Sequence, residues 1–123
     1  MPGSDPADGD FVDTIPLAAL EAGAQHSVYV GMRRVLLCRV DTDVFAFRDA
    51  CPHALQPLKG GAITGTTIRC PKHGACFDMK TGMPQNGITK ASLELYAVRI
   101  RDGIVQVDAG PDKRPNPYQQ FGG

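Results

Sequence analysis

The sequence is poor in several features that mark common classes of protein. Its 123 residues include no tryptophan, three histidines and four cysteines, and 13 basic residues balance 13 acidic ones. A formal net charge of zero argues against a protein that binds nucleic acid or a membrane surface through its charge. No apolar run approaches the roughly 20 residues that cross a bilayer. We therefore expect partners that are neither nucleic acid nor membrane.

The first residues also lack the features of a secretory signal. Residues 1–5 contain no basic residue and no apolar stretch. The protein is therefore predicted to be cytoplasmic. In a reducing compartment, the four cysteines are expected to be metal ligands or buried thiols rather than disulfides.

Glycine and proline are abundant, at 14 and 10 residues. They predict many turns, and together with stretches of alternating apolar residues they favour an all-β fold. The length predicts a single domain with one hydrophobic core. We assign residues 11–108 to this domain, residues 1–10 to a flexible N-terminal segment and residues 109–123 to a C-terminal tail.

Several stretches have the composition and alternation of β-strands. They are residues 11–15, 26–30, 33–40, 44–47, 66–69, 93–101 and 104–107. Residues 33–40 are apolar on both faces, so this strand is predicted to be buried on both sides. Asp102-Gly103, between the last two strands, is a strong signal for a hairpin turn.

Two short segments place cysteine and histidine close together in the sequence. Cys51-Pro52-His53 is followed, after sixteen residues, by Cys70-Pro71-Lys72-His73-Gly74. The prolines and the glycine indicate loops. We therefore take Cys51, His53, Cys70 and His73 as candidate ligands of one metal centre.

Thiolate and imidazole ligands together suit zinc or an iron–sulfur cluster. Structural zinc sites favour pairs of like ligands from each loop. Here each loop supplies one cysteine and one histidine, which fits a two-iron cluster with Cys51 and Cys70 on one iron and His53 and His73 on the other. A zinc site is the alternative.

The motif resembles that of the Rieske iron–sulfur proteins, in which C-x-H is followed at this distance by C-x-x-H. The resemblance is greatest to the small ferredoxins of bacterial aromatic-ring oxygenases, and it covers about residues 28–108. It implies the Rieske fold, an antiparallel sandwich or barrel-like base domain with a small cluster-binding subdomain that carries two ligand loops. It also implies one [2Fe–2S] cluster.

The resemblance further implies an electron carrier rather than an enzyme. Such a carrier takes single electrons from a flavoprotein reductase to a terminal aromatic-ring-hydroxylating oxygenase, docks near His53 and His73, and is expected to be a monomer. Only His26 remains for any second metal site, which argues against a complete oxygenase. A small Rieske subunit of a multisubunit oxidoreductase, such as a nitrite reductase, is the alternative, and a zinc-stabilised binding module is the third possibility.

Four positions differ from the high-potential Rieske proteins. Those proteins have an extra cysteine in each loop, joined as a disulfide, where this chain has Gln56 and Lys72. They also have a serine and a tyrosine that donate to sulfur, where this chain has Ala75 and Phe77. Fewer donors to the cluster stabilise its reduced state less, so we expect a reduction potential of about −150 mV, at the low end of the Rieske range.

The remaining thiols and the remaining histidine have simpler interpretations. Cys38 lies in an apolar strand and is expected to be a buried core thiol. Cys76 is expected to be packed or partly exposed and not to be a ligand. His26 is expected to lie on the surface.

Overall fold

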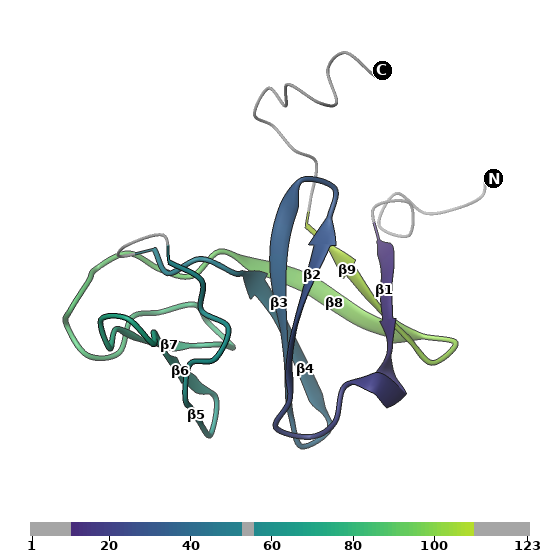
Figure 1. The fold of residues 1–123 in the computed structure, drawn as a ribbon, viewed down its shortest axis with the longest axis horizontal. Helices are drawn as coiled ribbons and strands as arrows, with labels where there is room; N and C mark the ends of the chain where they lie inside the picture. The colour runs from purple at the N-terminus through teal and green to yellow at the C-terminus, as the bar shows by residue number, and fades with distance from the viewer. Residues whose placement is uncertain (1–10, 53–55, 110–123) are drawn as a thin grey trace, which may run out of the picture.

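The computed structural model describes residues 11–52 and 56–109. The predicted N-terminal segment, residues 110–123 of the predicted tail and the candidate ligand His53 lie outside the described residues. Within them the chain is all-β, with nine strands and one 3-10 helix, Leu17–Ala19 (Figure 1). No helix in this part of the chain is long and apolar enough to cross a membrane.

Six strands form one antiparallel sheet in the order β1-β9-β8-β4-β3-β2. Their bounds are β1 Val12–Pro16, β2 Gln25–Val30, β3 Arg33–Val40, β4 Asp43–Arg48, β8 Leu95–Arg101 and β9 Ile104–Asp108. The two edge strands, β1 and β2, also contact each other, so the sheet curls almost into a barrel. This arrangement confirms the barrel-like antiparallel base domain that the resemblance implied.

Residues 49–94, between β4 and β8, form a second unit that we call the insert. Its strands β5 (Ile63–Thr64), β6 (Thr67–Arg69) and β7 (Cys76–Asp78) make a small antiparallel sheet. Figure 1 shows the insert at one end of the large sheet, on the left, with the β8–β9 hairpin at the other end. Both candidate ligand loops belong to the insert.

Strand β3 separates two hydrophobic cores. Leu36 and Cys38 pack with Phe47 against the insert, whereas Val35 and Leu37 point into the curled sheet. The predicted burial of both faces of β3 is confirmed, since all four of its central side chains are fully buried. The prediction of a single core is wrong, because each face of this strand packs against a different layer.

The predicted strands are present with small shifts at their ends. β3 has the predicted bounds, and β8 begins at Leu95 rather than at Leu93. The N–H of Leu93 donates instead to the carbonyl oxygen of Gly82, at 2.8 Å, in the loop that returns from the insert. β5 and β7 were not predicted, because strands of two and three residues are too short to show an alternating pattern.

A buried carboxylate joins the insert to the large sheet. One oxygen of Asp49 accepts hydrogen bonds from Oγ of Ser27 on β2 and Nε of Arg34 on β3, both at 2.7 Å. The other oxygen accepts from the N–H groups of Leu58 and Lys59, at 2.8 and 3.0 Å. Burial raises the pKa of Asp49, but these donors outweigh it and hold the pKa below its usual value. The carboxylate is therefore ionised, and each oxygen binds a different unit.

A side-chain amide makes a second connection between the same two units. Gln25, on β2, donates to the carbonyl oxygen of Gly61 at 2.7 Å and accepts from the N–H of Gly60 at 2.8 Å. Gly61 is needed here because a Cβ at this position would lie 2.1 Å from the carbonyl oxygen of Arg69. The segment after the first ligand loop therefore lies directly against both the large sheet and β6.

We expect Asp49→Ala to lower the free energy of unfolding by about 2–3 kcal/mol, because the buried N–H of Leu58 would lose its acceptor. Asp43→Ala, at an exposed position that starts β4, is the matched control and should change it by less than about 0.5 kcal/mol. Urea unfolding followed by circular dichroism measures both variants. Equal unfolding midpoints would contradict this role for Asp49.

Candidate metal centre

Backbone hydrogen bonds shape both candidate ligand loops. The N–H of Cys51 donates to the carbonyl oxygen of Gln56 at 2.7 Å and closes the first loop. In the second loop, between β6 and β7, the N–H of Cys70 donates to the carbonyl oxygen of Ala75 at 2.7 Å. Gly74 ends this turn with a φ of +77°, a conformation that favours glycine.

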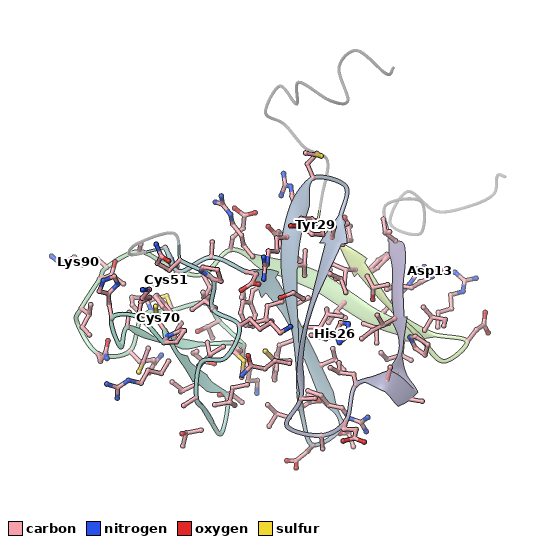
Figure 2. The ribbon with its side chains drawn as sticks, in the orientation of Figure 1. Asp13, His26, Tyr29, Cys51, Cys70 and Lys90 are labelled. Carbon is pink, nitrogen blue, oxygen red and sulfur yellow. The ribbon has the colours of Figure 1, made fainter. Side chains whose placement is uncertain are left out.

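The two cysteines of the motif meet where the loops leave the core. Cys51 and Cys70 are buried in the core on the insert side, and their side chains lie close together (Figure 2). Burial raises the pKa of Cys70, but the backbone N–H groups of His73, Lys72 and Gly74, together with Cys51, lower it below its ordinary value. A thiol whose ionised form is stabilised in this way is suited to bind a metal.

The structure describes one of the two histidines of the motif, His73. His73 is exposed, three residues beyond Cys70 in the same turn. His53 lies outside the described residues, and no group of three or more possible ligands comes together within residues 11–52 and 56–109. The side chains of Cys51, Cys70 and His73 therefore offer two buried sulfurs and one imidazole at the surface.

Asn86 is a residue of this site that the sequence analysis missed. Its side-chain amide donates to the carbonyl oxygen of Gly74 at 2.8 Å and accepts from the N–H of Cys76 at 3.2 Å. The N–H of Gln85 also donates to the carbonyl oxygen of Cys76, at 2.7 Å. The loop after β7 thus holds the end of the second ligand loop in place, a contact that no local pattern around Asn86 reveals.

The two other thiols and the third histidine lie where the sequence predicts. Cys38 is fully buried on β3, and burial raises the pKa of its thiol to about 12. Cys76 is partly exposed at the start of β7, with its sulfur 3.6 Å from the carbonyl oxygen of Gly74. His26 is exposed on β2, which is part of the large sheet (Figure 2). The three predicted positions are confirmed, and that Cys76 is not a ligand stays a prediction.

The fold and the paired thiols are those of a small iron–sulfur domain. The chain belongs to the Rieske [2Fe–2S] domain family, whose sequence model matches residues 10–97. This membership confirms the resemblance, the Rieske fold and one Rieske-type [2Fe–2S] cluster as the cofactor, and it removes the zinc alternative.

Similar proteins include both single-domain ferredoxins and a longer protein. Ferredoxin CarAc from Metapseudomonas resinovorans is 34% identical over 84 residues, which cover 68% of this chain and 78% of that protein. Human Apoptosis-inducing factor 3 is 36% identical over 90 residues, which cover 73% of this chain but 15% of that protein. A chain in the solved complex of reduced oxygenase and oxidised ferredoxin of carbazole 1,9a-dioxygenase superposes with a TM-score of 0.77 at 26% identity, over 85% of this chain and 98% of that one.

We expect Asn86→Ala to shorten the lifetime of the bound cluster by roughly tenfold, because residues outside the ligand set that orient it typically contribute this much to metal binding. Loss of the visible absorption in the presence of a chelator measures the lifetime. Gln85→Ala is the matched control, since the Gln85 side chain donates to the carbonyl oxygen of Met83 at 3.3 Å, within its own loop. Equal lifetimes of the two variants would refute the role of Asn86.

Proposed function

We propose that this protein is a ferredoxin that carries single electrons to a terminal oxygenase acting on aromatic rings. The observation that carries this proposal is its likeness to a chain solved in the complex of oxygenase and ferredoxin of carbazole 1,9a-dioxygenase. The similarity to ferredoxin CarAc supports the same role. The protein is then an electron-transfer component and not itself an enzyme.

Cys51 and Cys70 are proposed to hold one iron, and His53 and His73 the other. The meeting of the two buried thiols supports the first pair, and the exposure of His73 in the turn that follows Cys70 is compatible with the second. The bound cluster supplies reversible uptake of one electron. The N–H groups of Lys72, His73 and Gly74 face the sulfur of Cys70, where they stabilise its negative charge.

The electron donor is proposed to be a flavoprotein reductase, and both partners are proposed to dock near His53 and His73. The exposed imidazole of His73 supports this site, since a ligand at the surface shortens the path to a partner. Sequential docking of two partners at one surface fits a protein that acts as a monomer. No observation favours the alternative of a small subunit of a nitrite reductase.

Cys51→Ser, Cys70→Ser and His73→Ala should each abolish the visible spectrum of the [2Fe–2S] cluster and the electron paramagnetic resonance signal of the dithionite-reduced protein. The reason is that each of these changes removes a proposed ligand. Cys76→Ser and His26→Ala are the matched controls, since these residues lie outside the proposed set, and both should keep the signal. A full spectrum in Cys51→Ser would refute the ligand assignment.

The reduction potential should lie near the low end of the Rieske range, about −150 mV. Ala75 and Phe77 are both fully buried on the insert side and carry no hydroxyl group. Ala75→Ser should therefore raise the potential, and a new hydrogen bond worth about 1 kcal/mol corresponds to roughly 40 mV for a one-electron couple. A redox titration followed by absorption measures the midpoint potentials of the unaltered protein and of Ala75→Ser. A midpoint above zero for the unaltered protein would contradict the predicted low potential.

A further inference from the structure

The insert has exposed positive charges that form no ion pair with the residues that the structure describes. Its basic residues are Lys59, Arg69, Lys72, Lys80 and Lys90, and all five are exposed. Within the described part of the chain, none of them forms an ion pair with a carboxylate. Two of the three arginines of β3 differ, since Arg33 and Arg34 are paired with Glu94 and Asp49.

The acidic residues of the insert do not balance these charges. Asp49 is buried, and its charge is neutralised by an arginine of the large sheet. Glu94, at the end of the insert, lies 3.2 Å from Arg33. Asp78 accepts a hydrogen bond from the N–H of Lys80 at 2.8 Å and is the one acid left. The exposed surface of the insert is therefore basic, although the whole protein has a formal charge of zero.

Two of the cations, Lys72 and Arg69, lie close to the candidate metal centre, and Lys90 lies on the same insert. Lys72 is part of the second ligand loop, and its backbone N–H faces the sulfur of Cys70. The Arg69 guanidinium lies against the same loop, because its Nη2 atom is 3.0 Å from the point that a Cβ at Gly74 would occupy. Figure 2 shows Lys90 at the outer end of the insert, further from the large sheet than Cys51 and Cys70.

We propose that the insert is a basic docking face that receives an acidic patch of the protein with which this carrier exchanges electrons. This inference rests on the proposed function. Exposed like charges without partners contribute little to stability, and they repel one another. They create a positive potential around the exposed edge of His73, which attracts an acidic partner and orients it toward that edge.

The zero net charge makes this attraction depend on orientation. The chain itself carries no formal net charge, so the rate of a productive encounter mainly reports the charges around the metal centre, to which the electron held by the reduced cluster also contributes. An acidic protein surface is thereby favoured over a basic or purely apolar one. The partner's carboxylates would face Lys72 and Lys90 directly.

Two small oxidants of opposite charge test this without a partner protein. The cluster-loaded, dithionite-reduced protein, freed of excess dithionite, is mixed with hexacyanoferrate(III) or hexaamminecobalt(III) in a stopped-flow instrument over a range of ionic strength. Each oxidant takes one electron from the reduced cluster. We expect the second-order rate constant to fall with added salt for the anion and to rise for the cation.

A charge-reversed variant tests whether Lys72 and Lys90 cause the dependence of the oxidation rate on the charge of the oxidant. Lys72→Glu/Lys90→Glu should slow the reaction with hexacyanoferrate(III) by roughly tenfold at low ionic strength and should accelerate the reaction with hexaamminecobalt(III). Lys90→Glu alone should give a smaller change of the same sign. Arg101→Glu is the control for a single charge reversal, at the exposed β8–β9 hairpin at the other end of the molecule, and should change neither rate (Figure 1).

The outcomes separate this inference from the proposed function. Rates that do not depend on salt, or a faster reaction of the unaltered protein with the cation at low ionic strength, would overturn the docking face and leave the carrier function standing. Absence of the [2Fe–2S] spectrum from the unaltered protein would instead overturn the carrier function. If the double variant binds no cluster, the two salt dependences of the unaltered protein decide the matter.

Discussion

The buried carboxylate of Asp49 is the contact on which the position of the insert depends. One oxygen binds β2 and β3, and the other binds the N–H groups of Leu58 and Lys59. A buried charge is costly unless its hydrogen-bonding capacity is filled, and here both oxygens have two donors. Since Asp49 lies two residues before Cys51, the same contact sets where the first ligand loop leaves the large sheet.

Packing against β3 also helps to position the insert. The face with Leu36 and Cys38 packs in the core that also contains Cys51 and Cys70, so the thiols of the motif rest on the large sheet. The second loop is then held from the outside by Asn86. The buried Cys70 side chain and the hydrogen bonds of Asn86 restrict the motion of the turn after Cys70. This suits a carrier whose cofactor must change charge with little rearrangement.

Exposed basic side chains without carboxylate partners in the described residues gather on the insert. Arg33 and Arg34 of β3 form ion pairs with Glu94 and Asp49 at the junction. The cations of the insert stay exposed and without carboxylate partners in the described part of the chain. A sequence of zero net charge therefore folds into a molecule with a basic end at the metal centre. The charge balance alone gave no sign of this, because it averages over surfaces that point in different directions.

The sequence by itself determined the strands of the large sheet, the burial of both faces of β3 and the motif of Cys51, His53, Cys70 and His73, because alternation and ligand spacing are local properties. It did not predict β5, the second core or the roles of Asp49 and Asn86. β5 has only two residues, too few to show an alternating pattern. The second core and the contacts of Asp49 and Asn86 join residues that are distant in sequence, so only the tertiary structure shows them. The turn signals place two loops in the chain, but only the packing of the insert against β3 brings their cysteines together.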